Sequence, residues 1–333
     1  MKQQSLVTNG FEKYRKKTRK AVFLEQMDEI LPWTELCKAI EPFYPNASPL
    51  GGRPTVGIER MLRIHFLQHW FELSDPGAEE ALYDSNAMRA FVGIDLGNER
   101  VPDETTICKF RHLMERHNLG GELFRLVNVY LEENGLKLSR GTIVDATIID
   151  APRSTKNKKR QRDPDMESTR KGNQWYFGMK AHIGVDSQSK LIHSVMVTSA
   201  SMHDSQVLDD LLHGDERRVY GDSAYTGQKA RMKAVAPVAK DFTHKRGHRN
   251  RPLTDKERQA NRYKSKIRPR VEHLFGVIKH RFGYRKVRYK GLSKNAHFSN
   301  PRLIKITSMP NVGDILMADI ILWLFQQHSC QDN

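Results

Sequence analysis

Three acidic residues of this sequence stand in positions where a carboxylate can do chemistry. Asp145 interrupts the apolar, β-branched run at residues 142–149, where an ionised side chain is costly to bury unless it is paired or coordinates a metal. Asp222 falls where a predicted strand gives way to a loop, and Glu272 lies beside the apolar face of a predicted helix. Magnesium and manganese prefer oxygen ligands, so carboxylates brought together from rigid elements can hold such ions for phosphoryl transfer.

Each of these acids also has an ordinary structural explanation. Asp145 can face water at the end of a strand, and Asp222 can cap a helix or a turn. Glu272 can belong to a surface ladder of salt bridges, because Arg268 lies four residues before it and Lys279 seven residues after it. At about 100° per residue, these three side chains project along one line of the helix. A single acid among so many bases favours the functional interpretation of Glu272.

The charge of the chain points to a polyanionic partner. The 333 residues carry a net charge of +16, with a pI near 9.7. Residues 227–297 hold 22 Lys and Arg against four Asp and Glu, a surplus of 18, so the rest of the chain is close to neutral. A field of this sign favours nucleic acid as the partner first, and an anionic membrane second.

Other features exclude several classes of protein. The three cysteines, Cys37, Cys108 and Cys330, are scattered, which supports neither a disulfide framework nor a zinc site and favours a reducing cytoplasm. The basic N-terminal segment lacks the apolar core of a signal peptide. The most apolar run, residues 315–325, is about half as long as a membrane span and carries Asp319. We therefore expect a buried terminal helix or strand there, and no membrane span.

Residues 1–125 have the pattern of a helical domain. Core-type side chains recur at three- and four-residue spacing over residues 57–73, and a second helix is expected over residues 78–91. A third helix begins at residues 102–106 with a proline and an acidic first turn. Short helical pairs of this kind form DNA-binding helix-turn-helix motifs, but they also occur in domains that bind nothing. Both alternatives stay open.

From about residue 135 the pattern is that of a mixed α/β domain. We expect strands at residues 142–149, 176–185 and 191–198, joined into an antiparallel meander. A helix at residues 203–212, a short strand at 218–221 and a helix at 226–235 follow. This order outlines an RNase H-like fold, although other mixed α/β folds share it.

A basic segment, residues 152–173, separates the first two expected strands. It contains Lys158 and Lys159 among many other bases, with hardly an apolar residue. We expect it to be a mobile loop in the free protein. It is either a solvated run of charge or a loop that becomes ordered on DNA.

The segments around the three acids resemble the catalytic blocks of insertion-sequence transposases of the IS-five family, and they occur in the same order. They are TIVDAT at residues 142–147, YGDSAYTG at 220–227, and RPRVEHLFG at 268–276 continuing to Lys279. The similarity includes WYFGMKAH at 175–182, HDS at 203–205 and GGRP at 51–54. It covers roughly residues 25–297.

The resemblance implies a DDE transposase that moves an insertion sequence by cutting and pasting DNA. It implies an α/β, RNase H-like catalytic domain at residues 135–297, preceded by an all-α domain at 1–125 that helps to bind the terminal inverted repeats. Residues 298–333 form a divergent tail. Carried over position by position, Asp145, Asp222 and Glu272 become the catalytic residues and the ligands of two Mg²⁺ or Mn²⁺ ions.

The resemblance also suggests residues that bind DNA. Arg268 and Lys279 match the basic positions of a Tyr-Arg-Glu-Lys signature, although Ser265 stands where its Tyr is expected. The further candidate DNA contacts are Lys180, Arg270, Lys158, Lys159 and Arg281. The expected partners are terminal inverted repeats and target DNA, bound by a homodimer or a larger assembly in a bacterial cytoplasm, with no membrane involved.

Two other functions fit parts of the pattern. A DNA-binding regulator derived from a transposase would keep the fold and the charge, and a basic structural or RNA-associated protein would need the charge alone. Neither function requires three acids in these positions. Metal-dependent nicking of DNA distinguishes the enzyme from both.

Overall fold

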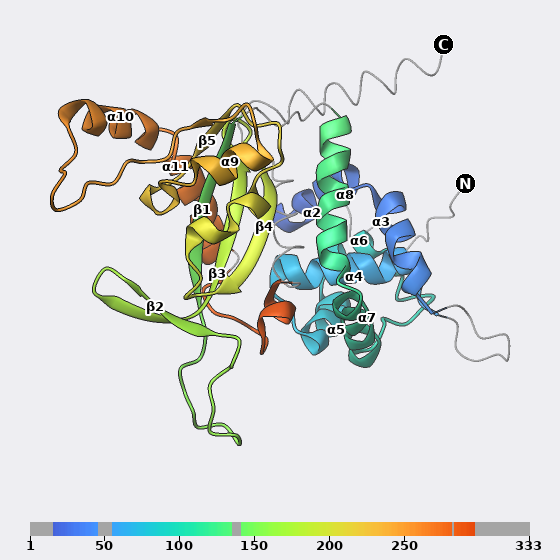
Figure 1. Cartoon of the computed structure of the whole chain (residues 1–333). Coiled ribbons are helices and arrows are strands. Elements are labelled where there is room, and N and C mark those ends of the chain that lie inside the picture. The colour runs from blue at the N-terminus through green and yellow to red at the C-terminus, as the bar shows by residue number, and fades with distance from the viewer. Residues whose placement is uncertain (1–15, 46–54, 135–140, 282, 297–333) are drawn as a thin grey trace, which may run out of the picture.

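The computed structural model describes residues 16–45, 55–134, 141–281 and 283–296, and it consists of a helical region followed by a sheet with its own helices (Figure 1). The helices of the first region are α2 (Arg19–Ile30), α3 (Trp33–Ile40), η1 (Glu41–Phe43), α4 (Ile58–Phe71), α5 (Asp75–Asp84), α6 (Asn86–Val92), α7 (Glu104–Arg116) and α8 (Leu119–Glu133). Because α8 continues past residue 125, the helical region reaches at least Glu133.

The helical periodicity of the sequence locates most of these helices. The stripe at residues 57–73 is α4, nine of whose side chains are buried. The helix expected at 78–91 is instead two helices, because Ser85 leaves the helical conformation, ends α5 and caps α6 with its side chain. The third helix, α7, begins as expected, since the Asp103 side chain accepts a hydrogen bond from the Thr106 N–H.

The sheet contains β1 (Gly141–Asp150), β2 (Glu167–Lys171), β3 (Gln174–Asp186), β4 (Ile192–Ser199), β5 (Arg218–Tyr220) and β6 (Lys240–Asp241). β1, β3 and β4 pair antiparallel, which confirms the expected meander. β5 pairs parallel with β1, and β6 pairs parallel with β5. The central strand order is therefore β4-β3-β1-β5-β6, as in the RNase H-like fold that the order of elements indicated.

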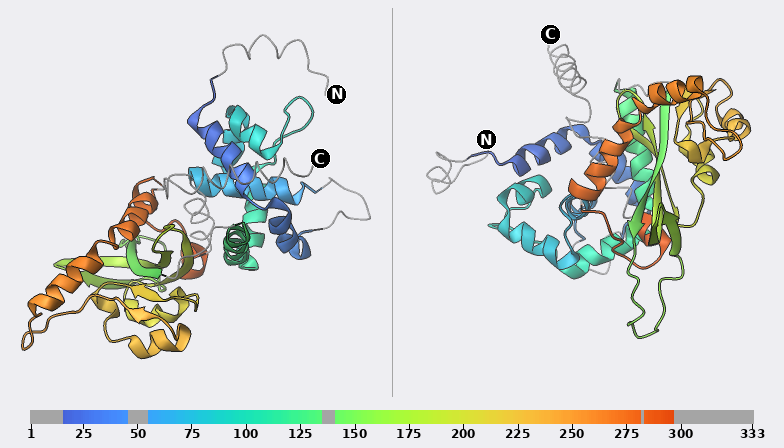
Figure 2. Two further views of the ribbon diagram at one scale, coloured as in Figure 1. Left: turned by 90° about the horizontal axis from the view of Figure 1, so that it is seen from above. Right: turned by 90° about the vertical axis from the view of Figure 1, so that its left-hand side faces the viewer.

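Helices and turns cover both faces of the sheet (Figure 2). On one face, α11 (Pro269–Gly276) packs its Val271 and Leu274 into the core that contains Ile143. Val144 points to the opposite face, into a second core that includes Met232 of α9 (Lys229–Val235), because successive side chains of a strand alternate.

The helix expected at residues 203–212 is wrong. This segment forms two short 3₁₀ turns, η2 (Asp204–Val207) and η3 (Asp209–Leu211). Val207, Leu208 and Leu211 are all buried in the second core. Packing of these three apolar side chains outweighs the helical propensity of the segment.

The basic segment at residues 152–173 contains a strand that the sequence did not predict. Its last residues form β2, which pairs with the outer part of β3, and Gly172 takes the left-handed conformation at the turn, with φ 61°. Before β2, the Asn157 side chain bonds both backbone groups of Gln161, and Arg162 donates to the carbonyl oxygen of Arg153. Backbone pairing with β3 does not require apolar side chains, so hydropathy gave no sign of this strand.

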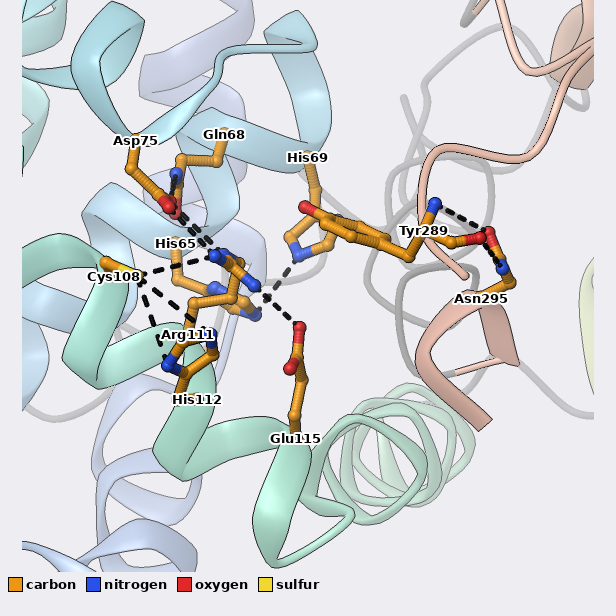
Figure 3. Close-up of polar contacts among 10 residues, drawn as sticks. All are labelled: His65, Gln68, His69, Asp75, Cys108, Arg111, His112, Glu115, Tyr289 and Asn295. Carbon is orange, nitrogen blue, oxygen red and sulfur yellow. Dashed lines mark hydrogen bonds and ion pairs between the residues drawn. The ribbon is translucent and has the colours of Figure 1, made fainter. Parts of the chain in front are cut away.

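The segment at residues 283–296, which we call the strap, connects the sheet with the helical region. It follows α10 (Asp255–Ser265), α11 and the π-helical turn η5 (Val277–Arg281). Its backbone pairs with Asp150 at the end of β1. Arg288 forms an ion pair of 3.2 Å with Glu72, and the Tyr289 ring lies 5.3 Å from the guanidinium carbon of Arg111 (Figure 3).

Arg111 is the centre of a polar network in the helical region (Figure 3). Its guanidinium forms ion pairs of 2.8 Å with both Asp75 and Glu115, and these three side chains are between 12% and 17% exposed. Gln68 donates a hydrogen bond of 2.8 Å to the same Asp75 carboxylate. The network therefore joins α4, α5 and α7.

Helices long and apolar enough to cross a bilayer are absent from the residues that the structure describes. Cys37 and Cys108 are free thiols. The apolar run at 315–325, the expected tail at 298–333, Cys330 and the GGRP segment lie outside the described residues.

Candidate catalytic pocket

The three acids that the sequence singled out line one cavity of about 440 Å³ in the sheet domain. They come from different elements: Asp145 lies in β1, Asp222 is the second residue after β5, and Glu272 lies in α11. We call this cavity the pocket. Its other lining residues are Ala146, Thr147, Ile148, Thr169, Arg170, Lys171, Lys180, Asp204, Arg268 and Phe275.

Asp145 is a largely enclosed carboxylate. Its side chain is 13% exposed, and its two oxygens accept hydrogen bonds from the Ala146 N–H at 2.8 Å and from Arg268 Nη2 at 3.1 Å. Burial raises the pKa of Asp145, the Arg268 charge opposes that rise, and the negative charge of Asp222 adds to it. The two aspartates therefore share one electrostatic environment.

Asp222 owes its place to a tightly packed glycine. A Cβ atom on Gly221 would stand 3.0 Å from the Tyr225 ring and 3.1 Å from a Val144 methyl, so any other residue would require these side chains to shift by a few tenths of an ångström. One Asp222 oxygen accepts the Ala224 N–H at 2.8 Å and caps the turn η4 (Ser223–Tyr225). The capping role considered from the sequence is real, and it leaves the second oxygen without a hydrogen bond among the described residues.

Glu272 lies in the first turn of α11, where a negative charge is favourable at the amino end of a helix. The helix begins with Pro269, and the buried Val271 and Leu274 anchor it to the sheet. The Glu272 side chain itself is exposed, with no hydrogen-bond or ion-pair partner within the described parts of the chain. The surface ladder considered from the sequence is therefore not formed: Arg268 pairs with Asp145 instead.

The three carboxylates are the kind of ligand that a divalent cation prefers, but in this structure they do not form a closed metal site. Carboxylate oxygens from three elements face one polar cavity, which suits Mg²⁺ or Mn²⁺. Over the described residues, however, no three Asp, Glu, His or Cys side chains are grouped closely enough to hold a metal ion. Arg268 already pairs with the Asp145 carboxylate, so a cation bound at Asp145 would have to compete with this guanidinium.

The candidate DNA-binding residues predicted from the sequence do not all lie at the pocket. Arg268 and Lys180 line the pocket. Arg270 donates to the carbonyl oxygen of Ser187. Lys158 and Lys159 line a different cavity of about 390 Å³, between the basic segment and the strap.

Lys279 is not among the residues that line the pocket. Lys279 is half-buried, and burial together with the nearby Lys171 lowers the pKa of its ammonium. The helix changes to a π-helical turn at Val277, so the 100° spacing that aligned Lys279 with Glu272 no longer applies. The side chain of Arg281 lies outside the described residues.

Sequence reasoning did not assign a fourth carboxylate, Asp204, to the pocket, and it counted Arg170 and Lys171 only among the bases of the segment at residues 152–173. Asp204 belongs to the HDS segment, whose resemblance was noted without a role. Arg170 and Lys171 belong to β2, which hydropathy did not reveal. Only the family resemblance carried a signal for Asp204.

Two transposase families match the chain. The family described as "Transposase DDE domain" matches residues 137–300, and the family described as "Transposase domain (DUF772)" matches residues 12–113. A cryo-EM structure of the piggyBac transposase synaptic complex with hairpin DNA aligns with 88% of this chain and 74% of that chain, at 11% sequence identity and a TM-score of 0.43. The two family matches account for both regions of the structure, and the chain therefore belongs to the DDE transposases, enzymes that mediate DNA transposition.

Proposed function

We propose that this transposase cuts and joins DNA strands at the pocket, with Asp145, Asp222 and Glu272 as the catalytic, metal-binding carboxylates. The observation that carries the proposal is the convergence of these three side chains from three separate elements on one polar cavity. The match of residues 137–300 to the DDE domain supports it. The similarity of the sequence blocks to the IS-five family extends it to cut-and-paste movement of an insertion sequence.

The cofactor of this reaction would be two Mg²⁺ or Mn²⁺ ions. When bound, such ions supply the charge that activates the attacking oxygen and stabilises the leaving oxygen of a phosphodiester. Asp145 and Asp222 would hold an ion together, since their carboxylates already influence each other electrostatically, and Glu272 would complete the ligand set from α11.

The chain's own bases would hold the DNA. Arg268 and Lys180 line the pocket, where a guanidinium and an ammonium can contact the phosphate that reacts. When DNA enters, the Arg268 guanidinium would leave the Asp145 carboxylate and donate to a phosphate oxygen instead, because carboxylate and phosphate are both anions that accept its hydrogen bonds. Lys158 and Lys159 would contact the phosphate backbone farther from the reacting bond.

The partners would be the terminal inverted repeats and the target DNA, in a bacterial cytoplasm. Transposition joins two ends, so we expect a homodimer or a larger assembly on DNA. The helical region, which the DUF772 match covers, would help to recognise the ends of the element.

Nicking of supercoiled plasmid DNA that carries the element's own ends tests this function. The wild-type protein should nick at those ends with Mg²⁺ or Mn²⁺, and EDTA should abolish the activity. Nicking that persists after chelation would contradict metal-dependent chemistry at the pocket. Binding without nicking under every metal condition would favour the DNA-binding regulator.

A further inference from the structure

Asp204 is a fourth carboxylate on the pocket, and its surroundings differ from those of the other three. It is the first residue of η2, directly after the loop that follows β4. Its side chain is 22% exposed and lines the pocket beside Lys180. Unlike Glu272, it has a cationic partner and lies against buried polar side chains.

That partner is the Lys180 ammonium. Lys180 Nζ donates to Asp204 Oδ1 at 2.9 Å and to the carbonyl oxygen of Met202 at 2.7 Å, and the Lys180 side chain is only 13% exposed. An ammonium has three N–H donors, so these two bonds leave one donor for the pocket. A long, flexible side chain is thereby held in one position.

His182 lies near Asp204 as a neutral ring, so it does not offset the carboxylate charge. Its ring is fully buried on β3, on the same strand face as Lys180. The Thr198 hydroxyl donates to the carbonyl oxygen of Ser199, so it accepts from His182 Nε2 at 2.8 Å and leaves Nδ1 as the unprotonated nitrogen. Nδ1 lies 4.0 Å from Asp204 Oδ1. Burial lowers the pKa of His182 to about 4, which keeps the ring neutral near pH 7.

Tyr225 completes the enclosure. Its side chain is fully buried, with a relative accessibility of 0%, and its turn η4 packs against η2. Burial raises the pKa of the Tyr225 hydroxyl, and the charges of Asp204, Asp145 and Asp222 raise it further. Within the described residues, neither the Tyr225 hydroxyl nor His182 Nδ1 has a hydrogen-bond partner. Lys180 is thus the cation that pairs with Asp204 among the described residues.

We propose that Asp204 is a positioning residue that holds the Lys180 ammonium in place to contact the phosphate undergoing cleavage. The proposal rests on the proposed function of the pocket. A loose ammonium beside Asp145 and Glu272 would be drawn to those carboxylates and would compete there with a divalent cation. The bonds to Asp204 and to the Met202 carbonyl hold the ammonium on the pocket lining, with one donor left for substrate.

The test is a double-mutant cycle in single-turnover cleavage, with the rate measured as a function of DNA concentration. Asp204→Asn and Lys180→Ala should each lower the rate at saturating DNA by about 10- to 100-fold, since misplacing a contact group by an ångström costs that much. DNA affinity should change by no more than about 3-fold. The double variant should be no slower than Lys180→Ala alone, because Asp204 acts through Lys180.

Matched variants separate positioning from a general loss of structure. Asp209→Asn is the control, because Asp209 is the next acid along the same segment, yet it pairs with Arg231 and lies outside the pocket. It should retain wild-type cleavage. Asp204→Glu and Lys180→Arg preserve the charge pair and should recover much of the rate. If Asp204→Asn fails to fold, the comparison of Lys180→Ala with Lys180→Arg still tests the Lys180 contact.

Three results would overturn the proposal. Asp204→Asn could cleave at the wild-type rate, or the losses of the two single variants could add in the double variant. Asp204→Asn could also weaken Mn²⁺ binding in calorimetric titration while Lys180→Ala does not, which would make Asp204 a metal ligand. If variants of Asp145, Asp222 and Glu272 are inactive while Asp204→Asn is fully active, only this inference is refuted. If variants of those three acids are active, the proposed function is refuted.

Discussion

Arg268 and Asp145 form an ion pair of 3.1 Å across the pocket, although they stand 123 positions apart in the sequence. The pair joins the start of α11 to the centre of β1, so it fixes the helix that carries Glu272 against the strand that carries Asp145. It also gives the Asp145 carboxylate a cation in the absence of metal. The same contact therefore joins two sides of the pocket, and at the proposed metal site it would compete with a divalent ion for Asp145.

This relationship predicts opposite effects of Arg268→Ala on two ligands. The DNA-free variant should bind Mn²⁺ several-fold more tightly than the wild type, because the competing guanidinium at Asp145 is gone. It should bind DNA more weakly, because a phosphate contact is lost. Calorimetric titration of Mn²⁺ and fluorescence anisotropy with DNA measure the two affinities. Unchanged Mn²⁺ affinity would show that the pair does not compete with metal.

DNA affinity should depend steeply on salt. Residues 227–297 carry a surplus of 18 positive charges, and each phosphate that they neutralise releases counterions. A plot of log affinity against log salt should be linear. Lys158 and Lys159 lie outside this stretch, in the basic segment at residues 152–173, and replacing both by Ala should reduce the slope by about 2, because two further phosphate contacts are lost. Anisotropy titrations across a salt series provide the slopes. A wild-type affinity that does not change with salt would rule out residues 227–297 as the surface that holds DNA.

The Arg111 network should matter for stability and not for chemistry. Arg111→Ala leaves Asp75 and Glu115 as largely buried carboxylates without their cation, and it should lower the free energy of unfolding by about 3 kcal/mol. Arg125→Ala is the control, because its ion pair with Glu122 is exposed to solvent and should contribute far less to stability. Urea denaturation compares the two variants. Equal losses of unfolding free energy in the two variants would contradict the role of Arg111 as the centre of this polar network.

The buried His193 predicts a loss of stability in mild acid. Burial and the nearby His213 lower its pKa from 6.5 to about 3, so between these values the unfolded chain binds a proton that the folded chain does not. Its contribution to stability is therefore complete above pH 6.5 and is lost as the pH falls toward 3. His193→Gln, which cannot take up the proton, should reduce the change in unfolding free energy between pH 7 and pH 5 by about 1 to 2 kcal/mol. Urea denaturation at the two pH values measures that change, and an equal change in wild type and variant would contradict it.

Much of the sheet domain could be predicted from the sequence because its signals are local. β-branched residues and a turn located the antiparallel meander, and apolar spacing located α11. The convergence of Asp145, Asp222 and Glu272 followed from their similarity to three catalytic blocks, not from any single segment. Each acid on its own had an equally good structural explanation, and Asp222 does cap a turn.

What the sequence missed depends on contacts between distant segments. Arg268 was expected beside Glu272 along a helix, but it bonds Asp145, because nothing in the local spacing reports which strand faces α11. Lys279 was expected on the same line, and the π-helical turn at Val277 removed that alignment. Asp204 was placed in a helix, whereas packing of its neighbours into the second core formed a 3₁₀ turn that directs it to Lys180.

The most direct measurement of the central claim is plasmid nicking by Asp145→Asn, Asp222→Asn and Glu272→Gln, with DNA binding measured in parallel. Each change keeps the size of the side chain but removes a charge that a divalent cation needs and that repels phosphate. We predict that all three variants lose metal-dependent nicking and bind DNA as tightly as the wild type or slightly more tightly. Asp210→Asn, which alters an exposed acid outside the pocket, should nick normally. Full nicking activity in any one of the three pocket variants would contradict the catalytic role of that carboxylate.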